Sequence, residues 1–250
     1  MDKKKRIVRV VVIALIVLAV AGGIKAWTYL SEYYEAEPEA TAVLDAGEEA
    51  GYIYASENDS ENLILKADGD TDTGILFYPG GKVEYTAYLP MLEQLREAGY
   101  DVVLIKMPFN LAFFDMNAGE KVLSDMSEEL PNVTKWYAMG HSLGGVSVSK
   151  FAAVHADMLE GLILLGSFDY GLYDEENTLI IYGSEDVQLD TSKINENLSD
   201  VLEIEGGNHA WFGYYGNQEG DGEATISKEE QQSITVNEIC SWIQSHEDNQ

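Results

Sequence analysis

The pentapeptide Gly140-His141-Ser142-Leu143-Gly144 constrains the fold of this chain more than any other feature. It follows an apolar run, residues 136–139, and it opens into a helical pattern that begins at Leu143. A Gly-x-Ser-x-Gly sequence between a strand and a helix is typical of a nucleophile elbow, a tight turn with room only for glycine on either side. The pattern predicts that Ser142 lies at the carboxyl end of a sheet, where the following helix N-terminus favours negative charge.

Strand and helix patterns alternate along the chain from Gly51 onward. This alternation predicts an α/β fold, with a mostly parallel sheet covered by helices on both faces. The later strand candidates are almost continuously apolar, as expected of buried parallel strands, whereas residues 52–55 and 63–66 suit an antiparallel edge. The later strands are expected over residues 74–78, 101–105, 135–139, 161–165, 178–182 and 201–204. Helices are expected over residues 88–98, 118–130, 143–156, 192–198 and 227–246.

Acidic residues dominate the chain outside its first 25 residues. The whole sequence has 44 acidic and 15 basic residues, and six of the basic ones lie within residues 1–25. Residues 26–250 therefore contain 43 acidic and 9 basic residues, a formal net charge of −34. Because such a surface repels phosphates, we expect no nucleic acid partner. The single cysteine, Cys240, is interpreted as a packed thiol on one face of a helix.

The N-terminal segment has the pattern of a membrane anchor. A basic cluster precedes residues 10–24, which lack charge and would span about 22 Å as a helix. Apolar neighbours extend this run toward the roughly 30 Å of a bilayer core, and the flanking Arg9 and Lys25 can extend to the interface. Basic residues favour the cytoplasmic side, which places the rest of the chain outside.

These patterns predict four segments in chain order. They are a cytoplasmic basic tail (residues 1–6), a transmembrane signal anchor (7–27), a juxtamembrane spacer (28–50) and a folded domain (51–250). The alternative is a cleaved signal peptide, because Ala19-Val20-Ala21 fits a small-x-small cleavage site. The first reading gives a single-pass protein of the cell membrane with an extracytoplasmic domain, and the second gives a secreted protein.

A serine nucleophile needs a base, and four histidines are available. His141 lies in the turn itself and is interpreted as structural, with its side chain directed away. His155 lies far along the helix that leaves the turn, and His246 lies near the C-terminus, where chain ends fray. His209 follows the last predicted strand in a glycine-rich loop, so it is the predicted base.

The carboxylate that orients the base should also follow a strand. Residues 179–182 run into Gly183-Ser184-Glu185-Asp186, and Asp186 is the best candidate. Glu185 and Asp190 are alternatives. The order Ser142, Asp186, His209 along the chain favours Asp186.

A tetrahedral oxyanion needs backbone N–H donors. One donor is expected from Leu143, the residue after the serine. The second should come from the loop Pro79-Gly80-Gly81-Lys82, with Gly81 as first choice and Lys82 as the alternative.

Together these motifs resemble the α/β-hydrolase fold family, most closely its small, lidless, dienelactone-hydrolase-like branch. The resemblance covers about residues 50–246. It implies Ser142 as nucleophile, Asp186 as orienting acid and His209 as base, with backbone donors at Leu143 and Gly81.

Two departures from the family pattern limit what the resemblance implies. Many members have His-Gly before the oxyanion donor, where this chain has Pro79-Gly80. Dienelactone hydrolases use a cysteine nucleophile, so their substrate is not carried over to Ser142.

The sequence leaves little room for a lid. Only residues 166–177 separate two predicted strands, in the interval where lids usually lie in this fold. An open site suits small or exposed acyl substrates.

The predicted function is therefore that of a serine hydrolase acting on an ester or related acyl bond, with no cofactor and no metal. Its expected partners are a small-molecule acyl substrate and, through the N-terminal helix, the lipid bilayer. The alternatives are an acyltransferase on the same fold and a non-catalytic surface-anchored binding protein.

Two groups of aromatic residues could line the acyl pocket or pack in the core. The first group is Phe109, Phe113 and Phe114, and the second is Trp211, Phe212, Tyr214 and Tyr215.

Overall fold

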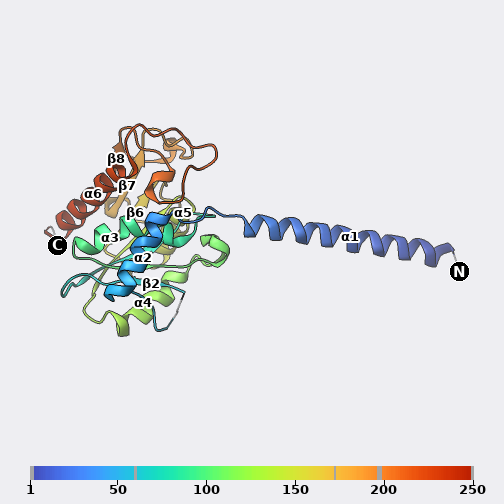
Figure 1. Cartoon of the computed structure of the whole chain (residues 1–250), viewed down its shortest axis with the longest axis horizontal. Helices are drawn as coiled ribbons and strands as arrows, with labels where there is room; N and C mark the ends of the chain where they lie inside the picture. Colours follow the sequence, from blue (N-terminus) through green and yellow to red (C-terminus); the bar gives the residue numbers. More distant parts are fainter. Residues whose placement is uncertain (1–2, 59–60, 172, 196–198, 249–250) are drawn as a thin grey trace. The chain divides into compact units, whose positions relative to one another are not determined.

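The computed structural model of the chain describes residues 3–58, 61–171, 173–195 and 199–248 (Figure 1). The chain divides into two units, Met1–Tyr33 and Tyr34–Gln250. Each unit is described by itself below.

The first unit is a single helix, α1 (Lys3–Ser31). Its stretch Val11–Ser31 has a mean hydropathy of 2.2, and no residue of that stretch is buried. The helix is long and apolar enough to cross a membrane. A signal sequence near an N-terminus can meet the same criteria of length and apolar composition, so both interpretations of this segment stay open.

The second unit is built on one eight-stranded sheet with the order β1-β2-β4-β3-β5-β6-β7-β8. β1 and β2 pair antiparallel at one edge, and every pair from β4 to β8 is parallel. The predicted α/β architecture with an antiparallel edge is therefore confirmed. The strands are β1 (Ile53–Ala55), β2 (Leu63–Leu65), β3 (Thr73–Tyr78), β4 (Asp101–Leu104), β5 (Lys135–His141), β6 (Gly161–Leu165), β7 (Thr178–Gly183) and β8 (Asp200–Ile204).

Helices cover both faces of the sheet because successive side chains of each buried strand point in opposite directions. In β3, Ile75 and Phe77 belong to one apolar cluster, which also contains residues of α3 and α6. Leu76 and Tyr78 belong to the other, with residues of α4 and α5. The α-helices of this unit are α2 (Pro38–Ala50), α3 (Leu89–Glu97), α4 (Ala118–Glu129), α5 (Leu143–Val154) and α6 (Lys228–Asp248).

The chain enters the second unit beside the loop that follows β3. The N–H of Tyr34 donates to the carbonyl oxygen of Lys82 (2.7 Å), and the N–H of Glu84 donates to the carbonyl oxygen of Tyr34 (2.9 Å). The helix α2 then packs against α3, which lies next to it in Figure 1, and against β1. Its Ala40 is fully buried. Residues 34–50 thus contribute contacts to the folded unit.

One predicted helix is wrong in the part that the structure describes. Residues 191–193 form a short 3-10 turn in place of the α-helix expected over 192–198, and residues 196–198 lie outside the described residues. Serine and asparagine are frequent there, and such side chains compete with helical hydrogen bonds by bonding to nearby backbone groups. The 3-10 helices are η1 (Tyr85–Tyr88), η2 (Pro108–Asn110), η3 (Ala112–Phe114), η4 (Ala156–Met158), η5 (Glu175–Asn177), η6 (Thr191–Lys193) and η7 (Ala210–Phe212).

Candidate active site

Ser142 lies between β5 and α5 in a backbone conformation that few residues adopt. Its φ is 52° and its ψ is −119°. The turn is tight because the chain approaches itself closely at both flanking glycines. A Cβ on Gly140 would lie 2.7 Å from the carbonyl carbon and oxygen of Gly144, and one on Gly144 would lie 2.2 Å from the carbonyl oxygen of Tyr78. The observed turn matches the one expected from the pentapeptide.

The strained turn is tied to its neighbours by backbone hydrogen bonds. The N–H of Ser142 donates to the carbonyl oxygen of Leu165, at the end of β6 (2.9 Å). The carbonyl oxygen of Ser142 accepts the N–H of Val146 and so begins α5 (3.1 Å). These bonds on both sides of the residue hold it in a conformation that it would not adopt alone.

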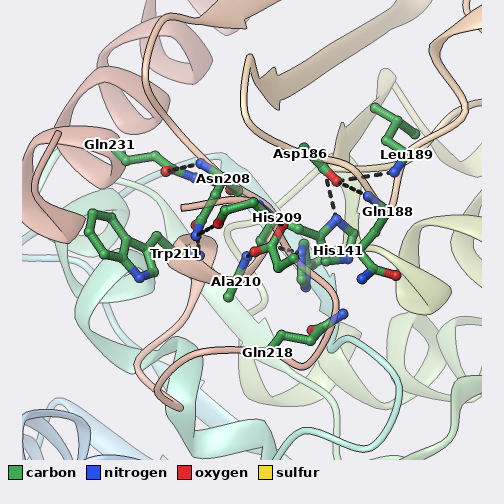
Figure 2. Close-up of polar contacts among 12 residues, drawn as sticks. His141, Asp186, Gln188, Leu189, Asn208, His209, Ala210, Trp211, Gln218 and Gln231 are labelled. Carbon is green, nitrogen blue, oxygen red and sulfur yellow. Dashed lines mark hydrogen bonds and ion pairs between the residues drawn. The ribbon is translucent and has the colours of Figure 1, made fainter. Parts of the chain in front are cut away.

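Asp186 and His209 form a buried pair (Figure 2). Nδ1 of His209 lies 2.7 Å from Oδ2 of Asp186, and the two side chains are 3% and 0% exposed. A carboxylate only accepts hydrogen bonds, so Nδ1 carries the proton and donates it. In the neutral ring, Nε2 then holds a free lone pair. This nitrogen is buried and has no hydrogen-bond partner among the described residues.

The second oxygen of Asp186 is held by the turn that follows β7. Oδ1 accepts the N–H groups of Gln188 (2.9 Å) and Leu189 (3.0 Å), as drawn in Figure 2. Hydrogen bonds to both oxygens fix the orientation of the carboxylate. Asp186 therefore presents a fixed acceptor to His209.

The two alternative acids do not contact His209. The N–H of Glu185 donates to the carbonyl oxygen of Gly207 (2.8 Å), and its side chain accepts from Ser184 (3.4 Å). Asp190 pairs with Lys193 (3.6 Å) and Ser192 in the turn that follows. Of the three acids considered from the sequence, the structure brings Asp186 to the histidine.

The loop that carries His209 is fixed by two residues that the sequence analysis missed. Asp221 accepts the N–H of His209 at Oδ1 (3.3 Å) and the N–H of Ala210 at Oδ2 (2.8 Å). The side-chain amide of Gln231, on α6, accepts from the N–H of Asn208 (2.9 Å) and donates to its carbonyl oxygen (2.8 Å). Asp221 lies in an acid-rich loop and Gln231 in a polar helical turn, so neither position stands out in the sequence.

The loop after β3 contains one N–H group suited to an oxyanion. The N–H of Gly80 donates to the hydroxyl of Tyr88 (3.0 Å), and that of Lys82 donates to the carbonyl oxygen of Asn110 (2.7 Å). Within the described residues, the N–H of Gly81 has no acceptor, and neither has that of Leu143. A Cβ on Gly81 would lie 3.1 Å from that of Leu143, so the two residues are neighbours.

Ser142 and His209 line the same open cavity, with a volume of about 320 Å³. Leu143, Gly166 and Gln218 also line it. A larger cavity of about 430 Å³ is lined by eight residues between positions 208 and 224, among them Gln218, but Ser142 does not line it. We regard the smaller cavity as the candidate active site because it contains the elbow serine. Among the described residues, no group of three or more potential ligands could hold a metal ion.

The remaining histidines lie as follows. His141 is buried, its ring centroid lies 4.7 Å from that of His209, and it is not among the residues that line the cavity. His155 stacks on Phe151 at the end of α5, and His246 packs on Trp242 in α6. Neither of these two rings contacts Ser142, Asp186 or His209 in the described structure.

The aromatic residues considered for the acyl pocket do not line the cavity. Phe212, Tyr214 and Tyr215 are buried, whereas Phe109, Phe113 and Phe114 are exposed and pack on one another. Trp211 lines the larger cavity. Phe168, which follows β6, does line the site, and the sequence analysis did not single out this position.

Comparison with known proteins identifies the family. Residues 74–233 match the alpha/beta hydrolase family, a region that extends from β3 into α6. The chain belongs to this family. The resemblance drawn from the motifs is therefore confirmed. No protein with a curated description matches the chain significantly.

Several solved structures share the fold. A monoglyceride lipase from Saccharomyces cerevisiae is 12% identical and has a TM-score of 0.55, covering 74% of this chain and 91% of the lipase. Est1E from Butyrivibrio proteoclasticus is 16% identical, with a TM-score of 0.53 and coverage of 73% and 93%. A dienelactone hydrolase from Anabaena variabilis is 15% identical, with a TM-score of 0.52 and coverage of 77% and 95%. At such identities the likeness establishes the fold alone.

Proposed function

We propose that this alpha/beta hydrolase is a membrane-anchored serine hydrolase that cleaves an ester or related acyl bond. One observation carries the proposal. The Nδ1–H of His209 donates to Asp186 over 2.7 Å, which leaves a lone pair on a buried Nε2 in the cavity that Ser142 lines. A neutral imidazole held in this tautomer is what the removal of a serine proton requires.

The proposed reaction follows the acyl-enzyme route. The Ser142 oxygen attacks the ester carbonyl carbon while Nε2 of His209 takes the hydroxyl proton. The N–H groups of Gly81 and Leu143 donate to the oxyanion of the tetrahedral intermediate. The imidazolium then protonates the leaving alcohol, and water activated by the same nitrogen releases the acid and restores Ser142. Asp186 stabilises the imidazolium in both steps.

The shape of the site supports a small or exposed acyl substrate. The cavity is open, and the segment between β6 and β7, where lids usually lie, is short. One structure similar in fold is named a monoglyceride lipase, so a monoacylglycerol belongs in the first ester screen beside short-chain esters. An acyltransferase would give the same acyl-enzyme, and added alcohol acceptors would divert its product.

The test of this function uses the full chain in detergent. We expect it to hydrolyse p-nitrophenyl acetate and to be labelled covalently by a fluorophosphonate probe. Ser142→Ala should abolish both reactions. Ser167→Ala is the matched control, because Ser167 lines the same cavity and should keep the label. Labelling that persists in Ser142→Ala would rule out the assigned nucleophile.

The proposed location rests on α1. An uncleaved anchor predicts that the protein stays with membranes after extraction at alkaline pH and that its N-terminal peptide is present in the mature chain. A cleaved signal peptide predicts a soluble chain whose N-terminus follows residue 21. Mass spectrometry of the mature protein distinguishes the two, and protease added to intact cells tests whether the domain is outside.

A further inference from the structure

His141 lies between the loop of the proposed base and the loop of the proposed oxyanion donor. It is the last residue of β5 and is 1% exposed. Its Nε2 lies 3.0 Å from the carbonyl oxygen of His209, and its Nδ1 lies 2.8 Å from the hydroxyl of Tyr88. That hydroxyl in turn accepts the N–H of Gly80 (3.0 Å), the residue before Gly81.

The direction of each hydrogen bond follows from the groups involved. A carbonyl oxygen only accepts, so Nε2 of His141 carries the proton and donates to His209. In the neutral ring Nδ1 is then an acceptor, and the Tyr88 hydroxyl donates a hydrogen bond to it. The hydroxyl oxygen is left to accept from Gly80. Three hydrogen bonds therefore run in one direction from the loop after β3, through His141, to the His209 loop.

The surroundings of His141 keep this arrangement in place. Burial, and to a lesser degree the neighbouring His209, lower the pKa of His141 well below its usual value, so the ring stays neutral. The rings of Tyr88 and Phe212 lie 5.6 Å and 5.5 Å from it. A Cβ on Gly80 would lie 2.5 Å from the Tyr88 hydroxyl oxygen and 2.7 Å from Nδ1 of His141, so glycine is needed for this approach.

We propose that His141 is a positioning residue of the hydrolase, which sets the place of the His209 main chain relative to the Gly80–Gly81 donor loop. The proposal rests on the proposed function, because the distance between the His209 main chain and the Gly80–Gly81 loop matters only if His209 is the base and Gly81 is a donor. His141 touches neither substrate nor Ser142 Oγ in this role. It acts through the His209 carbonyl group and, by way of Tyr88, through the Gly80 N–H.

The effect of losing His141 should be large but incomplete. Asp221 and Gln231 also hold the His209 loop, so the loop keeps part of its support. A displacement of about 1 Å in a catalytic group costs on the order of 100-fold in rate. We therefore expect His141→Phe, which keeps a ring but has no polar atom, to lower kcat about 10- to 100-fold. KM for a small ester should stay unchanged, because His141 does not line the cavity.

Two further variants separate positioning from folding. The hydrogen bonds from Gly80 through Tyr88 and His141 to His209 are called the relay below. Tyr88→Phe removes the hydroxyl from this relay and should also lower kcat without changing KM. His141→Gln keeps one donor and one acceptor on a planar amide, and it should restore most of the rate. If the three groups act as one relay, the double variant His141→Phe/Tyr88→Phe should lose about as much as the worse single variant.

Matched controls are available in the same unit. His155→Phe changes a histidine that packs on Phe151, and Tyr173→Phe removes a buried hydroxyl that donates to Leu159 (3.3 Å). Both should keep the wild-type kcat. Unchanged kcat in His141→Phe, or equal losses in His141→Gln and His141→Phe, would overturn the proposal. If His141→Phe does not fold, Tyr88→Phe decides by the same criterion.

A spectroscopic readout distinguishes this proposal from the proposed function. In ¹⁵N-labelled full chain in detergent micelles, His141 should show a protonated Nε2 and an unprotonated Nδ1. Tyr88→Phe should shift both signals and that of the His209 ring. The opposite tautomer would overturn the relay whatever the activity. A wild-type chain that is neither active nor labelled, yet shows the expected tautomer, would refute the hydrolase function and not the relay.

Discussion

A Cβ on Gly166 would lie 2.9 Å from Nδ1 of His209. The same added atom would lie 3.0 Å from Oδ2 of Asp186, so the backbone at the end of β6 packs directly against the buried acid–histidine pair. Gly166 also has a φ of +50°, which side chains other than glycine seldom adopt. The pair keeps its short hydrogen bond because this position has no side chain.

Gly166→Ala should therefore damage activity more than stability. We expect kcat to fall on the order of 100-fold, because the methyl group displaces the His209 ring or the Asp186 carboxylate. Gly51→Ala is the control, since Gly51 has a φ of +81° and open space around it. Both variants should lose about 1 kcal/mol of stability from backbone strain. Ester hydrolysis and denaturant unfolding measure the two effects, and equal kcat in both variants would contradict this packing argument.

Asp186→Asn tests the tautomer of His209. An amide nitrogen facing Nδ1 donates rather than accepts, so the imidazole proton would move to Nε2 and the ring could no longer act as base. We expect kcat to fall by about 10³- to 10⁴-fold with the fold intact. The matched control is Glu185→Gln, which changes the neighbouring acid that does not contact His209. The rate of p-nitrophenyl acetate hydrolysis measures this loss of kcat. A comparable loss in Glu185→Gln would argue against Asp186 as the orienting acid.

The buried His141 should make stability depend on pH. Its pKa in the folded chain lies well below the unfolded value of 6.5, so the unfolded state binds more protons between these two pKa values. Stability should therefore fall as the pH drops below about 6.5, with a slope of up to about 1.4 kcal/mol per pH unit from this group. Urea unfolding between pH 5 and 8 measures the slope. His141→Phe should show a smaller slope, and identical slopes would mean that His141 does not contribute.

Phe151 should be one of the residues on which the fold depends most. It is fully buried on α5, and its ring lies 6.2 Å from that of Tyr78. Phe151→Ala removes these contacts and leaves a cavity, so we expect a loss of about 3–5 kcal/mol in unfolding free energy. Val154→Ala, on the same helix but 72% exposed, should change stability by less than about 0.5 kcal/mol. Similar losses in both variants would contradict the described packing.

Local patterns were sufficient to predict most of the fold and the position of the serine. The strand, turn and helix around Ser142 are contiguous in sequence, and the apolar strands keep their pattern because both faces are buried. The proximity of Asp186 and His209 is predictable because each follows a strand, and the carboxyl ends of parallel strands meet at one edge of the sheet.

Contacts between distant residues were not predictable in this way. The bond of His141 to Tyr88 joins residues 53 apart, and its bond to His209 joins residues 68 apart. Asp221 binds the His209 loop from a long segment without periodicity, where many acids would fit the sequence equally well. Such contacts depend on how loops fold back over the sheet, which hydrophobic periodicity does not specify.

The way in which Tyr34 enters the folded unit bears on any attempt to prepare the domain without its N-terminal helix. A shortened protein that starts at residue 51 would lack the two hydrogen bonds that Tyr34 makes with Lys82 and Glu84, immediately after the proposed donor Gly81. It would also uncover Ile53, against which Gly47 of α2 packs. A version suitable for crystallisation or assay should therefore begin before Tyr34.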